Sequence, residues 1–336
     1  MDQKLTQDIF TQKNPIVLAP MEGVVDWEMR DTITRLGGFD LCVTEFIRVT
    51  DIPATDDIFF KFCPELRTQA KTRAGVPVLI QLLGGQPGPM AESALRAVEL
   101  GAPGIDLNFG CPAKTVNRSD GGAALLKNPR RVFDVVSAVR AEVPKIKTVS
   151  AKVRLGFSDK SQFLEIAQAA AEGGAAWLTV HARTRDEGYR PPAHWEYISR
   201  IREALSIPVI ANGDIWSLSD YERCREVSGC NAVMLGRGAI RSPELALRAK
   251  GLLDRKLAWM ECFKILVEYT KLLAATRDVK PWKADVAVCR FKQWLKQLRS
   301  NHPEALVLFE STKTIENYQD LMTQLQSIYP PAENIK

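Results

Sequence analysis

Eight short apolar runs that alternate with helix-like segments set the strongest limit on how this chain can fold. Most runs are continuously apolar rather than alternating, which is typical of parallel strands covered on both faces. Several of the segments between them show helical spacing and stop at glycine or proline, as at Gly173 and Pro144. Eight strand–helix units over about 240 residues predict a TIM (β/α)8 barrel. The predicted strands cover residues 16–19, 41–46, 76–83, 104–108, 149–153, 177–181, 208–211 and 232–236.

The pattern changes after residue 243, where we find amphipathic helices and no further strands. Segment 285–299 is the clearest, because apolar side chains recur there every three or four residues. We therefore expect an α/β fold with two domains, a catalytic barrel over residues 1–245 and an all-helical domain over residues 246–336. Basic side chains in the second domain form a patch suited to a phosphate backbone, although such a stripe is more often a solvated face. These side chains are Arg277, Lys280, Lys283, Arg290, Lys292, Lys296 and Arg299.

The composition, 46% hydrophobic and 25% charged, is that of a soluble globular protein. No apolar run approaches the ~18 residues of a membrane span, and the polar segment 1–14 lacks the apolar core of a signal peptide. The seven cysteines form no CxxC pair and do not have the spacing of zinc ligands, so we expect no metal site and reduced thiols in the cytoplasm. The net charge of +5 permits an anionic partner without requiring one.

One cysteine stands just after a predicted strand. The run from Gly104 to Asn108 stops abruptly at Gly110, Cys111 and Pro112, before a loop that contains glycine. In parallel α/β proteins, chemistry takes place at these strand ends, and Pro112 biases Cys111 toward extended backbone, which aims its thiol. The alternative is a small buried residue that ends a strand, which is the usual place of an unpaired cysteine. Cys111 is therefore a candidate catalytic residue.

Other predicted strand ends carry polar side chains that suit a planar cofactor with a phosphate group. Lys152 can stabilise an anionic ring nitrogen or carbonyl, while Gln81 and Asn108 can satisfy other polar groups of a ring. The turns Asn212-Gly-Asp214 and Gly236-Arg-Gly238 follow predicted strands seven and eight, where TIM barrels commonly bind phosphate. Together these residues describe a site for flavin mononucleotide (FMN).

Three other interpretations stay open at this point. They are a barrel that reduces a small molecule with FMN, a Schiff-base aldolase that uses Lys152, and a non-catalytic RNA-binding protein. Taken singly, Lys152 also fits a salt-bridged barrel lysine, and His181 fits a hydrogen-bonded core histidine. The basic helical region argues against the small-molecule enzyme, and a complete set of polar groups around one barrel mouth argues against a protein that only binds RNA.

Seven motifs together resemble the tRNA-dihydrouridine synthases, flavoenzymes that reduce selected uridines in tRNA. The resemblance runs from about residue 15 to about residue 327, and it is greatest to the bacterial branch that acts on position 16 of the D-loop. Segments 44–48, 212–216 and 290–294 carry the likeness to that branch. The motifs are Ala19-Pro-Met-Glu-Gly23, Gln81-Leu-Leu-Gly84, Asn108-Phe-Gly-Cys-Pro112, Lys152-Val-Arg-Leu-Gly156, His181-Ala-Arg-Thr184, Ala211-Asn-Gly-Asp-Ile215 and Gly236-Arg-Gly238.

The resemblance implies an enzyme in which reduced FMN gives a hydride to C6 of uracil and Cys111 protonates C5. NADPH (or NADH) would be the reductant, and we expect a cytoplasmic monomer. Asp214 stands where the branch has Glu, and we expect that turn to act mainly through its backbone. The expected FMN contacts are Pro20, Met21, Glu22, Gln81, Lys152, His181, Asn212, Gly213, Asp214, Gly236 and Arg237. The expected tRNA contacts are Arg48, Asn108, Arg154, Tyr189, Arg290, Lys292, Gln297 and Lys313.

Overall fold

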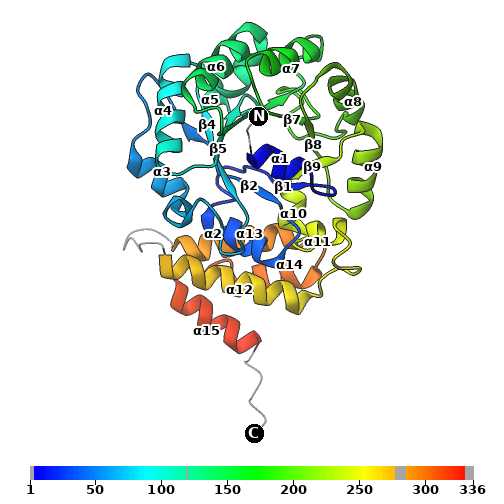
Figure 1. Ribbon diagram of the computed structural model, residues 1–336. Helices are drawn as coiled ribbons and strands as arrows, with labels where there is room; N and C mark the ends of the chain where they lie inside the picture. Colours follow the sequence, from blue (N-terminus) through cyan, green and yellow to red (C-terminus); the bar gives the residue numbers. More distant parts are fainter. Residues whose placement is uncertain (1–3, 119, 277–284, 330–336) are drawn as a thin grey trace.

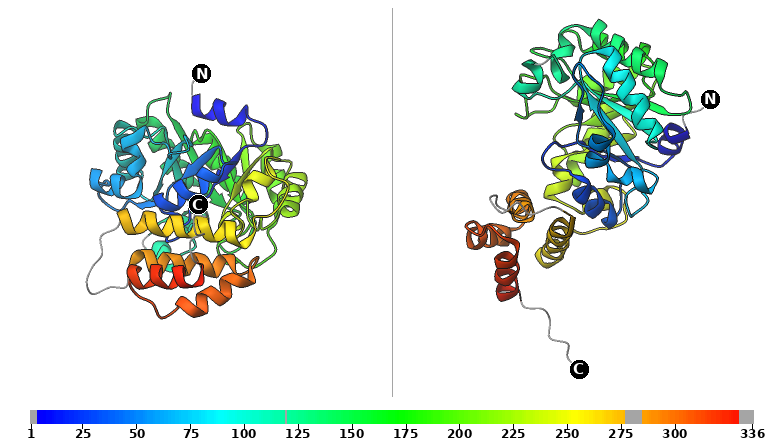
Figure 2. Two further views of the ribbon diagram at one scale, coloured as in Figure 1. Left: turned by 90° about the horizontal axis from the view of Figure 1, so that it is seen from below. Right: turned by 90° about the vertical axis from the view of Figure 1, so that its left-hand side faces the viewer.

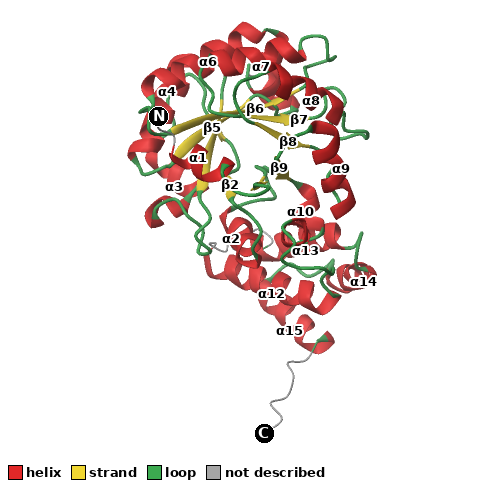
Figure 3. Cartoon of the chain, turned by 45° about the vertical axis from the view of Figure 1, so that its right-hand side comes forward, coloured by secondary structure: helices red, strands yellow, loops and turns green. Residues whose placement is uncertain are grey.

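The computed structural model describes residues 4–118, 120–276 and 285–329, and a ring of parallel strands lies at its centre with helices around it (Figures 1 and 3). β2 pairs with both β1 and β4, and β9 pairs with β1, so the sheet closes on itself. β2 and β3 pair with successive parts of β4 and together occupy the position of one strand of the barrel. The predicted TIM barrel is therefore confirmed. The strands are β1 (Ile16–Leu18), β2 (Leu41–Val43), β3 (Ile47–Arg48), β4 (Val78–Leu83), β5 (Gly104–Asn108), β6 (Thr148–Arg154), β7 (Leu178–His181), β8 (Val209–Asn212) and β9 (Ala232–Leu235).

The helices between the strands and just after β9 cover the barrel from outside, and their limits follow signals in the sequence. Asn128 caps α6 by accepting a hydrogen bond from the Arg130 backbone nitrogen at 3.1 Å, and Pro129 begins the helix. Ser217 caps α9 in the same way. These helices are α2 (Trp27–Leu36), α3 (Asp56–Phe62), α4 (Pro87–Glu99), α5 (Lys114–Arg118), α6 (Pro129–Glu142), α7 (Phe163–Glu172), α8 (Trp195–Ala204), α9 (Leu218–Ser228), α10 (Arg237–Arg241) and α11 (Leu245–Ala249), with 3-10 turns at Pro64–Thr68 and Gly122–Lys127.

Helix α1 (Lys4–Phe10), which we did not predict, closes the end of the barrel at which the strands begin (Figure 2). Ile9 is buried among side chains of the barrel interior. The Phe10 ring meets the edge of Trp177, with ring centroids 5.6 Å apart. The Thr6 hydroxyl lies 3.2 Å from the hydroxyl of Thr148, the first residue of β6. With this end closed, the opposite end of the barrel is the one left open to a ligand.

Helices α12 (Trp259–Thr276), α13 (Val286–Leu298), α14 (Pro303–Thr312) and α15 (Tyr318–Ile328) lie together on one side of the barrel (Figure 2). The Trp294 indole of α13 donates to the Ile240 carbonyl oxygen at 2.8 Å, and the apolar core of these helices continues into that of the barrel. The proposed domain boundary, between residues 245 and 246, falls at the start of α11 and stays a proposal. Three members of the predicted basic patch lie outside the described residues; they are Arg277, Lys280 and Lys283.

Within the described ranges, no helix is both long and apolar enough to cross a membrane. All seven cysteines are free thiols. In the same part of the chain, no group of three or more His, Cys, Asp or Glu side chains is arranged to hold a metal ion.

Candidate active site

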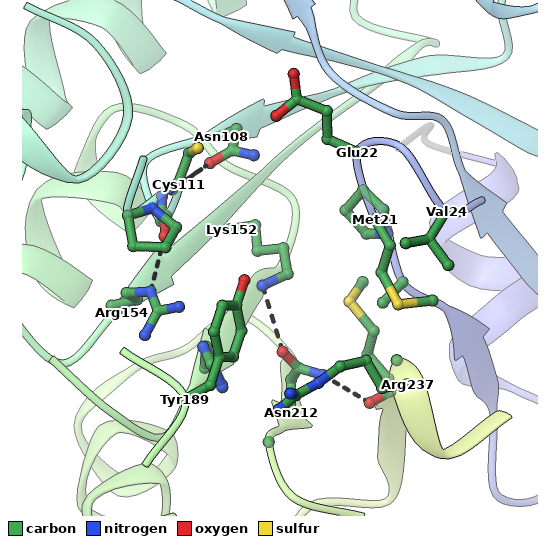
Figure 4. A pocket seen from close by; sticks show the side chains of 18 of the residues that line it. Met21, Glu22, Val24, Asn108, Cys111, Lys152, Arg154, Tyr189, Asn212 and Arg237 are labelled. Carbon is green, nitrogen blue, oxygen red and sulfur yellow. Dashed lines mark hydrogen bonds between the residues drawn. The ribbon is translucent and has the colours of Figure 1, made fainter. Parts of the chain in front are cut away.

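A cavity of about 460 Å³ opens at the carboxyl ends of the strands, and loops from most of the barrel contribute to its wall (Figure 4). This volume lies in the range of small-molecule and cofactor sites. The predicted catalytic cysteine, all the predicted FMN contacts and three of the predicted tRNA contacts line it. These residues are Pro20, Met21, Glu22, Gln81, Asn108, Cys111, Lys152, Arg154, His181, Tyr189, Asn212, Gly213, Asp214, Gly236 and Arg237.

The loop that carries Cys111 is tied down through its backbone. The Asn108 side-chain oxygen accepts hydrogen bonds from the backbone nitrogens of Gly110 and Cys111, both at 2.9 Å. The Cys111 carbonyl oxygen accepts from the Asn117 side-chain amide at 2.9 Å and from the Ala123 nitrogen at 3.2 Å. The backbone on both sides of the thiol is therefore held by contacts that do not involve its sulfur.

The environment of the Cys111 thiol keeps it protonated at neutral pH. Burial raises its pKa above the usual value, and the nearby Glu22 carboxylate raises it further. A backbone hydrogen bond from Ala113 to the sulfur and the cations Arg154 and Lys152 lower this pKa, but the net shift is upward. A protonated, half-buried thiol is suited to donate a proton rather than to act as a nucleophile.

Behind this loop, buried polar groups of three adjacent strands form one hydrogen-bonded chain. The Gln81 side-chain nitrogen donates to Asp106 at 2.6 Å, and the Ser150 hydroxyl donates to the other oxygen of Asp106 at 2.7 Å. The Asn108 side-chain nitrogen donates to the Gln81 side-chain oxygen at 2.8 Å. The amides of Gln81 and Asn108 therefore have fixed orientations at the cavity wall.

Lys152 lies in the cavity with an ammonium group that the protein contacts only in part. Its Nζ donates to the Asn212 side-chain oxygen at 3.3 Å, and this is its one hydrogen bond found among the described residues. The Asn212 amide is fixed in turn, because its nitrogen donates to the Met234 carbonyl oxygen at 2.8 Å. Burial lowers the pKa of Lys152 to about 8, with a further contribution from Arg154. Lys152 is thus a desolvated cation with hydrogen atoms left for an acceptor in the cavity.

His181, at the end of β7, is neutral. Burial holds its pKa well below the ordinary value, and the neighbouring cations Arg154 and Lys152 lower it further. The backbone of Gly213 passes so close that an added Cβ would lie 2.9 Å from the imidazole Cδ2. The Trp195 indole fixes this turn by donating to the Gly213 carbonyl oxygen at 2.9 Å.

The turns after β8 and β9 pack against each other, and glycine allows the approach. A Cβ on Gly238 would overlap the carbonyl oxygen of Ile215. Beside them, the Asp214 carboxylate forms an ion pair with buried Arg183, one of whose bonds measures 3.1 Å. The Asp214 side chain thus helps to hold the turn, and the expectation that the turn acts on a cofactor mainly through its backbone stays a prediction. The Arg237 guanidinium lies over the Tyr189 ring, 4.5 Å from its centroid.

Arg154 joins two loops of the cavity wall that lie on the same side of the cavity (Figure 4). Its Nε donates to the Gly110 carbonyl oxygen at 2.7 Å. Its Nη1 donates to the carbonyl oxygens of Thr184 and Gly188 at 3.0 and 2.9 Å. The side chain is buried, so these bonds give it a structural part between the Cys111 loop and the loop that presents the exposed Tyr189.

A sequence model of the dihydrouridine synthase family matches residues 17–327. The chain belongs to the dihydrouridine synthase family. Two relatives bear the name of the predicted branch, tRNA-dihydrouridine(16) synthase. The one from Shewanella oneidensis is 46% identical over 311 residues, 93% of this chain and 97% of the relative. The one from Pseudomonas putida is 50% identical over 300 residues, 88% of this chain and 91% of the relative.

The predicted family and branch are therefore confirmed, and the Schiff-base aldolase and small-molecule reductase interpretations are set aside. Solved structures show the same barrel. An old yellow enzyme homologue from Zymomonas mobilis has a TM-score of 0.51 at 15% identity and covers 73% of this chain and 91% of its own. A 2-naphthoyl-CoA reductase has a TM-score of 0.55 at 10% identity and covers 73% of this chain and 52% of its own. These likenesses show the fold alone.

Five of the tRNA contacts expected for this dihydrouridine synthase lie away from the cavity. Arg48 is exposed on β3, and Gln297 is half-buried on α13. The Lys292 ammonium donates to the carbonyl oxygens of Lys313 and Ile315, at 2.8 and 2.5 Å, just after α14. The Lys313 ammonium pairs with Glu310 at 2.6 Å. Arg48 and Gln297 are the two of these four side chains with no hydrogen bond or ion pair found in the described part of the chain.

Arg290, the fifth, faces the barrel of this dihydrouridine synthase. Its guanidinium donates to the carbonyl oxygen of Gly23, and its Nε lies 3.4 Å from the buried Asp26 carboxylate. The Gln293 side-chain nitrogen donates to the same Gly23 oxygen at 2.9 Å. Helix α13 therefore holds the turn after β1, whose residues Pro20 and Met21 line the cavity.

Three residues that shape the site were not among the contacts expected from the sequence. Asp106 underlies the Gln81 amide, Arg183 holds Asp214, and the Trp216 ring lies 4.8 Å from the Arg237 guanidinium. A signal for Asp106 existed, because residues two apart on a strand point to the same face, and Asp106 is two before Asn108. The pairing of Arg183 and Asp214 depends on neighbouring loops, for which the sequence carries no comparable pattern.

Proposed function

We propose that this chain is a monomeric, flavin-dependent tRNA-dihydrouridine synthase that reduces the C5=C6 bond of uridine 16 in the D-loop of tRNA. The observation that carries the proposal is a protonated Cys111 thiol that faces the same cavity as the Lys152 ammonium, in a chain closely similar to tRNA-dihydrouridine(16) synthases. One face of the cavity thus offers an acid and another offers a cation, which is the arrangement that reduction of a conjugated carbonyl compound requires.

The residues present fit FMN. The Lys152 ammonium has spare hydrogen atoms toward the cavity, which suits an anionic ring, and the Gln81 and Asn212 amides lie on either side of it. Met21 supplies apolar surface for a planar ring system, and Arg237 beside the tight turn after β9 suits the phosphate group. When bound, the reduced flavin supplies a hydride to C6 of the uracil ring, with NADPH or NADH as the reductant.

The proton for C5 comes from the Cys111 thiol. Hydride addition at C6 leaves negative charge on C5 and the C4 oxygen, so a neighbouring acid is needed. Asn108 holds the loop and Arg154 joins it to its neighbour, so both orient the thiol through backbone contacts. Lys152 and neutral His181 are the groups left to face the developing charge.

The uridine must leave the stacked bases of folded tRNA to enter the cavity, which costs a few kcal/mol that protein contacts must offset. Tyr189 stands exposed at the rim, between the guanidinium groups of Arg154 and Arg237 at 5.3 and 4.5 Å from its ring centroid. An exposed aromatic ring that packs against cations is suited to stack on a base. We assign Tyr189 that role.

The function is tested by adding the purified protein, its flavin content first read from the visible spectrum, to an unmodified tRNA transcript with NADPH. Dihydrouridine is then mapped along the transcript. We expect a yellow protein and modification at position 16. Modification at another position would overturn the branch-specific part of the proposal, and a colourless protein that forms no dihydrouridine would overturn all of it.

Charge reversal should separate the two kinds of predicted tRNA contact. Arg48→Glu removes an exposed cation and should weaken tRNA binding, reduce the slope of log Kd against log salt by about 1, and leave flavin content unchanged. Arg290→Glu places a carboxylate beside buried Asp26 and the Gly23 carbonyl group, so it should lower flavin content as well as tRNA affinity. Gel shifts at several salt concentrations and flavin absorbance are the measurements. Equal flavin content in the two variants would show that α13 does not hold the cavity turn.

A further inference from the structure

We propose that Asp106 is a positioning residue that sets the orientation of the Gln81 and Asn108 amides and, through them, of the loop that carries Cys111. The link to proton transfer rests on the proposed function, whereas the ordering of the loop does not. Among the described residues Asp106 forms no salt bridge, although Lys152 is near enough to act on it electrostatically, and it lies behind the cavity wall rather than in it.

Strand register brings the participants together. In the barrel, Gln81 of β4 is the partner of Asp106 on β5, and Asp106 is in turn the partner of Ser150 on β6. All three side chains are buried, with at most 1% of the surface of each exposed. The Gln81 nitrogen reaches one carboxylate oxygen at 2.6 Å, and the Ser150 hydroxyl reaches the other at 2.7 Å. The carboxylate is therefore bound on both oxygens by neighbours that register places beside it.

The chemistry of the carboxylate fixes the direction of the whole chain. An ionised carboxylate only accepts hydrogen bonds, so the Gln81 amide must turn its nitrogen toward Asp106 and its oxygen toward Asn108. Asn108 must then present its nitrogen to Gln81, which leaves its oxygen for the backbone nitrogens of Gly110 and Cys111. Rotation of either amide by half a turn would place a donor against a donor.

The same orientation decides what the cavity presents to a ligand. Gln81 and Asn108 both line the cavity, and each side-chain nitrogen carries a second hydrogen atom beyond the one used in the chain. A buried carboxylate is costly to keep, and burial raises the pKa of Asp106 accordingly. An apolar residue would fill the space at lower cost, but it would remove the acceptor at the Gln81 end of the chain and leave the Gly110 and Cys111 N–H groups as the only groups that direct the two amides.

The experiment compares four variants. Asp106→Leu keeps the approximate shape of the side chain and removes both carboxylate oxygens as hydrogen-bond acceptors. In Asp106→Asn the new amide can keep its oxygen toward Gln81 while its nitrogen donates to the Ser150 hydroxyl. In Ser150→Ala the Asp106 carboxylate keeps its hydrogen bond from Gln81. The double variant Asp106→Asn with Ser150→Ala removes the group that decides which way the new amide points. The double variant therefore tests whether the direction of the amides matters, without a large change in side-chain volume. It can be used in place of Asp106→Leu if the leucine variant does not fold.

The readout is the rate at which iodoacetamide alkylates Cys111 in protein freed of flavin, followed by peptide mass spectrometry. Exposed Cys289 on α13 is the internal reference. We expect Asp106→Leu and the double variant to raise the Cys111 rate roughly 3- to 10-fold, because release of the loop corresponds to the loss of about one hydrogen bond. Each single polar variant should stay within about twofold of the unaltered protein. Flavin affinity, measured separately, should fall in the same two proteins.

An unchanged Cys111 rate in a folded Asp106→Leu variant and in the double variant would overturn the inference, whatever the enzyme reduces. A raised rate in a protein that forms no dihydrouridine even with Asp106 in place would support the positioning role and reject the proposed function. A rise in Asp106→Asn alone, equal to that of the leucine variant, would show that the charge rather than the direction of the acceptor matters and would also overturn the inference.

Discussion

Alanine in place of Cys111 is expected to lower the rate of dihydrouridine formation by a factor of about 10² to 10⁴, the contribution of a positioned acid. The flavin should remain bound, because the loop is held mainly through the backbone of Cys111. Its nitrogen bonds to Asn108, and its carbonyl oxygen accepts from Asn117 and Ala123. The measurement is a single turnover of flavin-reduced enzyme with tRNA, with the flavin content determined in the same sample.

Cys289→Ala is the matched control, since it removes an exposed thiol on α13 that has no contact with the cavity. It should turn over at the rate of the unaltered enzyme. Serine at position 111 is also informative, because a hydroxyl is a far weaker acid than a thiol, and we expect it to resemble alanine. A near-normal rate in Cys111→Ala would mean that the proton comes from another group, and the assignment of Cys111 would be wrong.

The positions of the site residues could be predicted because most of them follow directly from strand order. Asn108 ends one continuous apolar run and Lys152 lies in the next, so the parallel topology brings them to the same edge of the barrel. The turn at Gly238 was also predictable, since glycine there is required by the close approach of Ile215. Local pattern and strand topology together were sufficient for these residues.

Residues that depend on contacts between distant segments could not be placed in the same way. Arg290 and Lys292 stood out as members of the basic patch, and charge alone does not distinguish a side chain that faces RNA from one that binds the protein's own backbone. The structure shows both bound to carbonyl oxygens of the chain, Arg290 to Gly23 and Lys292 to Lys313 and Ile315. Helix α1 was missed for a related reason, because a short polar segment becomes a helix only when the barrel end supplies a surface for Ile9.

Methionine in place of Lys152 is expected to lower the rate by a factor of about 10² to 10³, as the loss of one preorganised group at a developing negative charge does. The structural basis is that the Lys152 ammonium is desolvated and has one hydrogen bond, to Asn212 at 3.3 Å, among the described residues. Lys147→Met is the matched control. Lys147 lies just before the other end of β6, where its ammonium donates to the Ala102 carbonyl oxygen at 3.0 Å, and its replacement should leave the rate unchanged.

The pH dependence of the rate tests whether the positive charge of Lys152, and not only its side chain, contributes to catalysis. Because its pKa is lowered to about 8, Lys152 is charged below that pH and becomes neutral as the pH rises through it. The rate should therefore fall above about pH 8, whereas the Cys111 thiol, with a raised pKa, still carries its proton there. In Lys152→Met the low rate should stay level through this range and fall only when Cys111 ionises. A fall near pH 8 that persists in the methionine variant would belong to another group, and the role of the Lys152 charge would then be refuted.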